Sequence, residues 1–398
     1  MKVLQITAFS GWGCTGRIAL GINNVLIENN NESAIAWGRK NTAQKDTFTI
    51  KVGNKYDQIV HGLYTRITDK CGFASNKVTR EFIKKLDKYN PDIIHLHIMH
   101  GYYINLEILF EYIKEKHIPV VWTFHDCWAF TGHCPYFDAI GCEKWKTGCN
   151  NCELKSHHPT SWLLDNSRWN YEKKRQLFTG IKNMTIVTPS KWLAELVKES
   201  FLKDYPIVVI NNGINLDNFK QTKSNFKKEY NIEDKKIILG VSSTWCKSKG
   251  IGDFVKLSKV LDNNYKVVLV GVTKEQKKKL PNSILAIERT DNVKELAQIY
   301  TAADVFVNPT YEDNYPTTNI EAIACGTPVI TYRTGGSVEI IEETGYGKII
   351  EQGDIKGIVK AITKLSCLKY NGVEKYNEDI KFLEYVNLYE SIVGEKND

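Results

Sequence analysis

No uninterrupted apolar stretch in this 398-residue chain approaches the roughly 20 residues that a membrane-spanning helix requires. A signal-peptide pattern is also missing, because Met1 and Lys2 lead directly into an expected strand, Val3 to Thr7. The sequence has no internal repeats and no low-complexity tract. We therefore expect a folded cytoplasmic protein without a membrane span.

The acidic residue that completes a dinucleotide-binding fingerprint is missing too. Residues 11–16, GWGCTG, have the spacing G-x-G-x-x-G between an expected strand and an expected helix. Ala36 to Lys40 occupies the end of the next strand, where NAD-binding chains place an acidic residue, so NAD is not expected. Arg39 keeps an NADP-dependent oxidoreductase open as the alternative function. The broader interpretation is a turn in which Gly13 and Gly16 let the backbone approach a ligand between domains.

What is present is a globular composition, with 42% hydrophobic and 25% charged residues. The net charge of +7 arises in residues 1–200, where 26 Lys and Arg stand against 19 Asp and Glu, and all nine histidines lie there. This asymmetry indicates two domains with different partners. The excess is mild and fits a solvated surface, and we expect no nucleic-acid partner.

Strands and helices alternate and then the series restarts, which predicts two Rossmann-like, doubly wound α/β domains with a cleft between them. We place them at 1–195 and 196–375, followed by a terminal helix at 376–398. The expected strands are Val3–Thr7, Ser33–Trp37, Asp92–Ile98, Val120–Phe124, Met184–Thr188, Ile237–Val241, Lys266–Gly271, Val305–Val307 and Val329–Tyr332.

Residues 304–336 form the centre of the second domain, a strand–loop–helix–strand unit followed by a loop that contains Gly335. The expected helix begins near Pro316, Thr317 and Thr318. Its free N–H groups and positive dipole end suit a phosphate.

Carboxylates surround this helix start at Glu312, Asp313 and Glu321. An ionised carboxylate only accepts hydrogen bonds, so its natural partners are sugar and ribose hydroxyls. A nucleotide-sugar therefore satisfies the whole segment. The alternative for Glu321 is a capping box with Thr318, in which it would only close the helix start.

Two candidates lie in other loops. His125 directly follows a strand, at the edge of the sheet where sites form, whereas His95 and His97 share a strand face and are interpreted as core residues. Lys249 follows the strand that ends at Val241, where an ammonium group can neutralise a diphosphate leaving group, and Lys247 can assist it.

Taken together, these features resemble the retaining GT-B glycosyltransferases, specifically glycosyltransferase family 4 of the bacterial surface-polysaccharide type. The resemblance covers nearly the whole chain. It rests on the loop Gly11–Arg17 and on Thr123–Asp126, Val209–Ile214, Lys249-Gly250, Glu312–Glu321, and Cys325–Ile330.

The resemblance implies roles for individual residues. Glu321 would bind the ribose hydroxyls and Asp313 the donor sugar, Lys249 would hold the diphosphate, and His125 would orient the sugar. Asn314 belongs to the same donor-binding loop. The family transfers a sugar from a UDP- or GDP-sugar to a glycan or polyprenol-linked acceptor with retention, without a metal, and no Asp-x-Asp metal motif is evident here.

The chain departs from the family pattern at two positions. Asp313 stands where the family's E-x7-E motif has its first glutamate, with Glu312 one residue earlier, so either can contact the sugar. The basic residue usually found five positions before the lysine is Thr244 here. That phosphate contact then falls to Arg333, Lys247 or helix N–H groups.

Four cysteines, Cys134, Cys142, Cys149 and Cys152, have the spacing C-x7-C-x6-C-x2-C. Cytosolic chains rarely keep disulfides, so a structural zinc ion is one interpretation and a set of reduced, packed thiols is the other. The other six cysteines show no pairing pattern and are expected to act as small hydrophobic residues.

Residues 76–88 predict a basic amphipathic helix, with Val78, Phe82, Ile83 and Leu86 on one face. Such a helix can lie on anionic lipid, which would make this a peripheral protein at the inner face of the plasma membrane. The alternative is an ordinary helix that packs on its own sheet.

Overall fold

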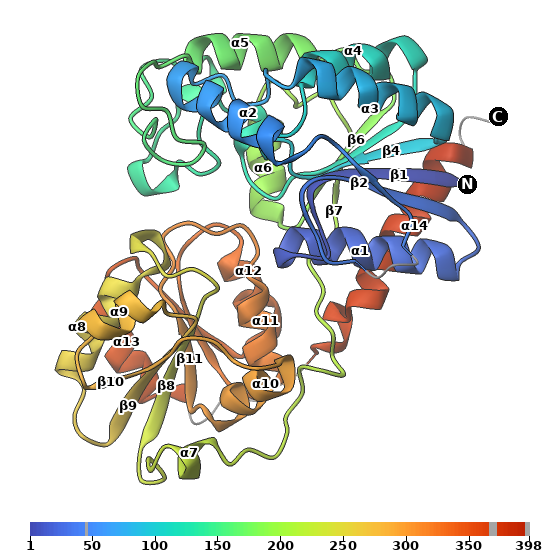
Figure 1. Cartoon of the computed structure of the whole chain (residues 1–398). Helices are drawn as coiled ribbons and strands as arrows, with labels where there is room; N and C mark the ends of the chain where they lie inside the picture. Colours follow the sequence, from blue (N-terminus) through green and yellow to red (C-terminus); the bar gives the residue numbers. More distant parts are fainter. Residues whose placement is uncertain (44–46, 366–371, 395–398) are drawn as a thin grey trace. The chain divides into compact units, whose positions relative to one another are not determined.

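The computed structural model describes residues 1–43, 47–365 and 372–394 of the chain (Figure 1). It divides into two compact units, Met1–Asn211 together with the segment from Lys381 onward, and Asn212–Ile380. The division falls later than the boundary expected after residue 195, because residues 207–209 form the edge strand of the first sheet.

The first unit is built on a seven-stranded parallel sheet in the order β3-β2-β1-β4-β5-β6-β7. Its central strands are mainly apolar and almost wholly buried, as strands covered on both faces must be. The strands are β1 (Lys2–Ser10), β2 (Glu32–Asn41), β3 (Thr49–Lys51), β4 (Ile93–Leu96), β5 (Val120–Thr123), β6 (Met184–Thr188) and β7 (Ile207–Val209).

Helices cover both faces of this sheet (Figure 1). On one face, α14 packs with α1, where Phe382, Tyr385, Val386 and Tyr389 contact the apolar side of α1. A Cβ on Gly21 of α1 would come within 2.1 Å of the Phe382 ring, so the two helices approach closely only because that position is glycine. The helices of the unit are α1 (Gly13–Glu28), α2 (Lys55–Thr68), α3 (Asn76–Tyr89), α4 (Leu106–Lys116), α5 (Ser167–Phe178), α6 (Lys191–Glu199) and α14 (Glu378–Gly394).

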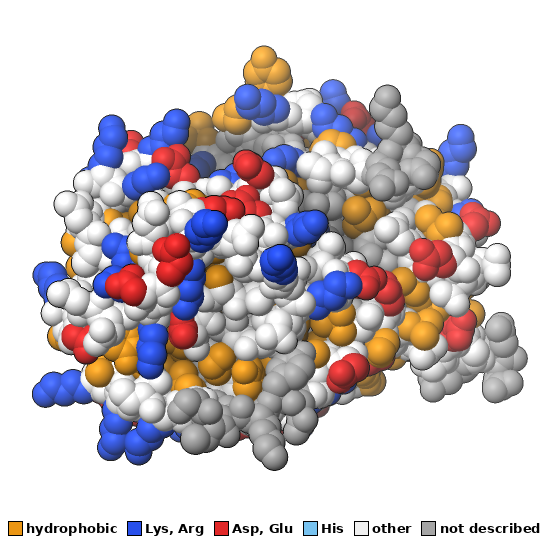
Figure 2. Space-filling view, turned by 90° about the horizontal axis from the view of Figure 1, so that it is seen from below, with side chains coloured by type: hydrophobic (Ala, Val, Ile, Leu, Met, Phe, Trp, Pro, Cys, Tyr) orange, Lys and Arg blue, Asp and Glu red, His pale blue; other side chains and the backbone are white. Residues whose placement is uncertain are grey.

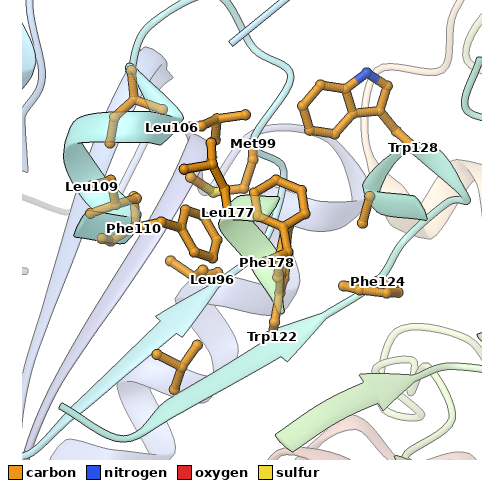
Figure 3. Packing of buried hydrophobic residues seen from close by; sticks show 14 of the residues in the cluster. Leu96, Met99, Leu106, Leu109, Phe110, Trp122, Phe124, Trp128, Leu177 and Phe178 are labelled. Atoms are coloured by element: carbon orange, nitrogen blue, oxygen red, sulfur yellow. The ribbon is translucent and has the colours of Figure 1, made fainter. Parts of the chain in front are cut away.

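The other face holds the larger core, in which aromatic side chains from strands and helices interlock (Figure 3). Trp122 of β5 meets Phe178 of α5 edge to face, with ring centroids 4.9 Å apart, and Phe110 of α4 lies 4.5 Å from the same Phe178 ring. Such aromatic pairs stabilise by about 0.5–1.5 kcal/mol beyond the area they bury. This core fixes β5, the strand that leads to His125.

Helix α3 turns its apolar side into this core. Phe82 and Leu86 are buried there, and Val78 and Ile83 pack against it. Of the two interpretations of residues 76–88, packing on the unit's own sheet is therefore correct, and the apolar face is not available to lipid. Among the described residues, no helix combines the length and the apolar character needed to span a bilayer.

The second unit is a six-stranded parallel sheet in the order β10-β9-β8-β11-β12-β13. Helices α10, α11 and α12 share one core with the sheet, and α8 and α13 share another on its opposite face. The strands are β8 (Lys236–Val241), β9 (Tyr265–Val270), β10 (Ile284–Ile287), β11 (Val305–Asn308), β12 (Val329–Tyr332) and β13 (Gly347–Ile350). The helices are α7 (Phe226–Glu229), α8 (Ile251–Val260), α9 (Lys274–Lys279), α10 (Val293–Ala302), α11 (Thr317–Ala324), α12 (Ser337–Thr344) and α13 (Ile355–Ile362).

Charged side chains of both signs are interspersed over the face shown in Figure 2, with apolar atoms in small groups between them. This distribution agrees with the modest net charge of +7. Mixed charge of this kind is typical of a solvated protein surface.

Candidate active site

The strand order of the second unit defines where its ligand site lies. The chain runs outward from β8 through β9 to β10 and then returns to the other side of β8 as β11, so the order reverses between β8 and β11. Open α/β sheets bind ligands at this switch point, beyond the carboxyl ends of the strands. The loops there are residues 242–250, which carry Lys249, and residues 309–316, which carry Glu312 and Asp313.

Backbone contacts fasten these two loops to each other. Tyr311 N–H donates to Ser248 O at 2.7 Å. Gly250 has a φ of +73°, and a Cβ there would meet Pro309 O at 2.2 Å, so this close approach requires glycine. The site residues of the second unit are therefore held together before any ligand binds.

Lys249 is the polar centre of the joined loops. Its Nζ lies 2.7 Å from Asp313 Oδ2 and donates to Glu312 O at 3.1 Å and to Thr310 Oγ1 at 3.4 Å. The Lys249 side chain is one-third exposed, so a ligand can reach it. The structure thus brings together three predicted residues, Lys249, Glu312 and Asp313.

The two neighbouring carboxylates have different surroundings. Asp313 faces Lys249 and also accepts from Asn314 N–H at 3.0 Å. The Glu312 side chain is half-buried, and within the described residues its carboxylate takes part in no hydrogen bond or ion pair. In this state Asp313 is the counter-ion of Lys249, and the Glu312 carboxylate is open to a ligand.

Glu321 does not form a capping box. Helix α11 begins at Thr317 with Pro316 as its N-cap residue, and no side chain caps it. Thr318 is thus inside the helix, so the capping alternative is wrong. Glu321 is instead 7% exposed and accepts a hydrogen bond from Tyr300 OH of α10 at 3.0 Å.

The other predicted donor residues occupy the same edge of the sheet. Thr317 and Thr318 open α11, and Gly335 lies just before Ser337, where α12 begins after β12. Both helices therefore point their N-terminal ends, and the positive ends of their dipoles, to the carboxyl edge. Lys247 is exposed in the first loop, whereas Arg333 pairs with Glu351 at 2.8 Å.

The sequence did not predict the hydrogen bonds by which Asp253 holds loop 309–316 in place. Asp253 of α8 is buried and accepts from Tyr311 OH at 2.6 Å and from Tyr332 OH at 3.0 Å. Burial alone would raise the pKa of Asp253, but these hydrogen bonds and one from Lys256 hold it below its usual value. Asp253 thereby ties loop 309–316 to α8. Nothing in the spacing of these residues signals the contact.

The glycine-rich turn of the first unit lies at that sheet's own switch point, between β1 and β4. Gly11 N–H donates to Gly16 O at 2.9 Å, and Gly11 and Gly13 both have φ of +69°. A Cβ on Gly16 would lie 3.2 Å from Phe9 Cβ. The predicted turn is present, and α1 begins inside it at Gly13.

A chain of hydrogen bonds fixes the tautomer of His125. Gln5 Nε2 donates to Ala19 O at 2.8 Å, so Gln5 Oε1 accepts from His97 Nε2 at 3.0 Å. His97 Nδ1 is then an acceptor, and His125 Nε2, 3.2 Å away, must donate to it. The acceptor nitrogen of His125 is therefore Nδ1. Burial lowers the pKa of His125 to about 4, so the ring is neutral near pH 7.

The remaining histidines serve other roles. His95 is saturated by the hydroxyls of Thr123 (2.8 Å) and Tyr389 (2.6 Å), as its core interpretation predicts. His97 is buried but is a link in the chain to His125. His100 Nε2 pairs with Asp126 Oδ2 at 2.9 Å. This pair was not singled out from the sequence.

Comparison with known families fits this geometry. Residues 48–218 match the family described as Glycosyltransferase Family 4, and residues 222–381 match Glycosyl transferases group 1. The two matches adjoin and together span most of the chain. The chain is a glycosyltransferase with the GT-B fold.

Individual proteins agree with this class. A protein described, provisionally, as the colanic acid biosynthesis glycosyl transferase WcaC of Escherichia coli (strain K12) is 26% identical over 320 residues, which cover 76% of this chain and 77% of that one. The N,N'-diacetylbacillosaminyl-diphospho-undecaprenol alpha-1,3-N-acetylgalactosaminyltransferase of Campylobacter jejuni is 27% identical, over 50% of this chain and 58% of that one. Sucrose-phosphate synthase from Thermosynechococcus elongatus superimposes with a TM-score of 0.69 over 99% of both chains, at 16% identity, which shows the shared fold alone. The comparisons give no support to an NADP-dependent oxidoreductase.

Proposed function

We propose that this glycosyltransferase moves a sugar from a UDP- or GDP-sugar to a glycan or polyprenol-linked acceptor, with retention and without a catalytic metal, in surface-polysaccharide biosynthesis. The observation that carries the proposal is the group of Lys249, Glu312 and Asp313 at the switch point of the second sheet. Lys249 provides a cation for a diphosphate, and the neighbouring carboxylates of Glu312 and Asp313 can accept hydrogen bonds from hydroxyl groups.

The donor would bind in three parts. Lys249 and the N-terminal ends of α11 and α12 would hold the diphosphate, whose negative charge grows as the sugar–phosphate bond breaks. Glu321 would accept hydrogen bonds from the ribose hydroxyls, and Glu312 or Asp313 from the sugar. With a cation and N–H groups in these places, the leaving group needs no metal ion.

His125 would contribute as a neutral ring. With Nε2 donating to His97, its Nδ1 can accept a hydrogen bond from a sugar hydroxyl. Its lowered pKa, about 4, keeps it in that form at the pH of a cytoplasm. We assign it the orientation of the donor sugar.

The names of relatives support the acceptor class and the stereochemistry. The Campylobacter jejuni relative is named for a diphospho-undecaprenol acceptor and an alpha-1,3 linkage. An alpha-linked product made from an alpha-linked nucleotide donor has the retained configuration. The Escherichia coli relative is named for the biosynthesis of a polysaccharide, colanic acid.

An exposed apolar surface in the first unit supports contact with a lipid bilayer. Helix α2 turns Tyr56, Ile59, Val60, Leu63 and Ile67 to solvent, and the first three are 80%, 55% and 65% exposed. Their spacing, i, i+3/i+4, i+7 and i+11, puts them on one side of the helix. Soluble surfaces rarely leave such a stripe uncovered.

A neighbouring loop extends this stripe. Trp162 N–H donates to Arg66 O at 2.6 Å and Leu164 N–H to Ile67 O at 3.3 Å, so Trp162, Leu163 and Leu164, all more than half exposed, adjoin the end of α2. Arg66 lies 5.4 Å from the Trp162 ring centre. Aromatic and leucine side chains with basic neighbours match the interface of an anionic membrane, where a polyprenol-linked acceptor is held.

Flotation tests this surface. Wild-type protein should float with vesicles of phosphatidylcholine and phosphatidylglycerol, and binding should fall with salt. Val60→Ser combined with Leu163→Ser should abolish it, while Ile27→Ser, a change at another exposed apolar residue, on α1, should not. If the double variant floats like wild type, the surface does not contact lipid. If wild-type protein without lipid is a dimer and the double variant is a monomer, the stripe is a dimer interface instead.

A donor panel tests the reaction. Wild-type protein should be stabilised against heat by one nucleotide class, UDP- or GDP-sugars, and should release the matching nucleoside diphosphate only when a polyprenol-linked acceptor is added. Activity should persist in chelator. Stabilisation without release in the presence of any acceptor would instead indicate a non-catalytic sugar-nucleotide-binding protein.

A further inference from the structure

The four spaced cysteines come together in the first unit. Cys134, Cys142, Cys149 and Cys152 all line one small cavity, whose remaining wall is largely Phe137, Trp145 and Leu154. The thiols of Cys134 and Cys152 interact directly, and Cys142 and Cys152 both act on Cys149. Residues separated by up to 18 positions thus line the same cavity.

The surrounding chain has little regular structure to hold it. Between residues 131 and 155 it forms only two short 3-10 turns, Asp138–Ile140 and Lys144–Lys146. A covalent or metal link would therefore contribute much of the order of this segment.

A backbone N–H group contacts one of the four sulfurs. Gly132 N–H donates to Cys149 Sγ at 3.1 Å. A Cβ on Gly132 would lie 2.2 Å from Ser167 O and 2.6 Å from Cys149 Cβ, so only glycine lets this N–H reach the sulfur. N–H donors to sulfur are the outer contacts that orient and stabilise metal-bound thiolates.

A buried cation faces the same cluster. Lys174 of α5 is fully buried, with its Nζ bonded to Trp128 O at 2.7 Å and Thr131 O at 3.0 Å and lying 3.4 Å from the Trp128 ring centre (Trp128 is labelled in Figure 3). Among the described residues no carboxylate forms an ion pair with it. Burial lowers the pKa of Lys174 to about 7, while Cys71, Cys149, Cys134 and Asp69 all act to raise it. Buried charge requires compensation.

We propose that this cluster is a structural zinc site with four cysteine ligands. Zinc bound by four thiolates carries two net negative charges, which a buried lysine and an N–H donor would offset. Each thiol gives its proton to solvent as its sulfur binds the ion. The set is complete without a water ligand, so the site is structural and takes no part in the transfer reaction.

Nearby histidine is already engaged elsewhere, which favours four sulfurs over three sulfurs and an imidazole. His133 pairs through Nδ1 with Asp69, and its Nε2 lies 3.4 Å from His157 O. In the described part of the chain, no three His, Cys, Asp or Glu side chains yet surround one point as metal ligands do. Binding must therefore draw the sulfurs inward to about 2.3 Å from the ion, by rotation of the thiols and a shift of the loop.

The site would steady the segment that carries His125. Cys127 N–H donates to Pro135 O at 2.8 Å, and Tyr136 OH donates to His125 O at 3.4 Å. These contacts join the cysteine loop to the end of β5. The zinc inference nevertheless stands apart from the proposed reaction, since it depends only on the cysteines and their surroundings.

Metal analysis of the whole chain tests the proposal. Protein purified in a reducing buffer without chelator should contain about one zinc per chain. Titration with an organomercurial should release that zinc in step with modification of four thiols. Replacement by Co²⁺ should give the strong visible absorption of tetrahedral cobalt bound to sulfur.

Two cysteine variants sharpen the test. Cys142→Ser, at a half-buried ligand, should lower bound zinc at least tenfold after dialysis, whereas Cys246→Ser, at an exposed cysteine outside the cluster, should leave one zinc per chain. Wild-type protein without zinc would overturn the proposal, whether its thiols are all free or two of them are joined as a disulfide. Equal zinc in the two variants would also overturn it.

Discussion

Lys249 Nζ lies 2.7 Å from Asp313 Oδ2, so the cation assigned to the donor diphosphate is neutralised by a carboxylate of its own site. A diphosphate must compete with Asp313 for this ammonium group or share it. Asp313 was expected to contact the sugar. The ion pair gives it a second task, which is to keep Lys249 in position while the site is empty.

Exchanging the two carboxylates separately should distinguish their roles. Asp313→Asn removes the competitor for Lys249, so we expect a nucleoside diphosphate to bind as tightly or several-fold more tightly, while kcat of transfer falls. Glu312→Gln leaves the ion pair intact and should raise KM for the donor with little change in nucleoside diphosphate affinity. Calorimetry with UDP and GDP, together with steady-state kinetics, measures both. Weaker nucleotide binding by Asp313→Asn would show that Asp313 does not compete with the diphosphate for Lys249.

Glu321→Gln should weaken donor binding roughly tenfold or more, because a charge-assisted hydrogen bond contributes about 1.5–3 kcal/mol. The matched control is Tyr300→Phe, which removes the hydroxyl partner of Glu321 but keeps its carboxylate. That control should lower Tm more than it lowers nucleotide affinity. Full activity with reduced Tm in Glu321→Gln would mean that Glu321 only supports α11.

Acid should destabilise the first unit before its carboxylates titrate. Burial lowers the pKa of His125 and of His158 to about 4, against an ordinary value of 6.5. Between pH 6.5 and 4 these histidines are protonated in the unfolded chain but neutral in the folded chain. The free energy of unfolding therefore falls as pH drops from about 6.5 toward 4. For His125 the loss is at most about 3.5 kcal/mol, since one pKa unit corresponds to about 1.4 kcal/mol.

Urea unfolding at several pH values between 7.5 and 4.5 measures this slope. His125→Gln should flatten it, and His117→Asn, at an exposed helix end, should leave it unchanged. A wild-type free energy of unfolding that stays constant down to pH 4.5 would contradict neutral burial of these histidines.

The sequence predicted every interior strand of both sheets and missed the four edge strands, β3, β7, β10 and β13. Interior parallel strands are buried on both faces and therefore appear as mainly apolar runs. An edge strand is partly solvated: β7 is only half-buried, and β3 has a single buried residue.

The candidate site was predictable where chemistry follows local sequence. Lys249 and Glu312 to Pro316 stand in loops that follow strands, Glu321 lies in the helix that comes next, and the switch-point rule brings such loops together. The contacts that could not be predicted depend on the directions of side chains from elements that are distant in the sequence. The contacts of Asp253 with Tyr311 and Tyr332 and the link from His97 to His125 join residues far apart in the chain, and no spacing encodes them. The outward apolar stripe of α2 was missed as well, since periodicity alone does not say which side of a helix the core covers.

The central claim is that the second unit binds a nucleotide-sugar through Lys249. The most direct test is calorimetric titration of UDP- and GDP-sugars into wild-type protein, into Lys249→Ala, and into Lys259→Ala, which changes an exposed lysine of α8. We predict binding of one nucleotide class by wild type and by Lys259→Ala, and a roughly ten- to hundredfold loss of affinity in Lys249→Ala. Equal affinity in all three proteins, or no binding of either class by wild type, would contradict the account.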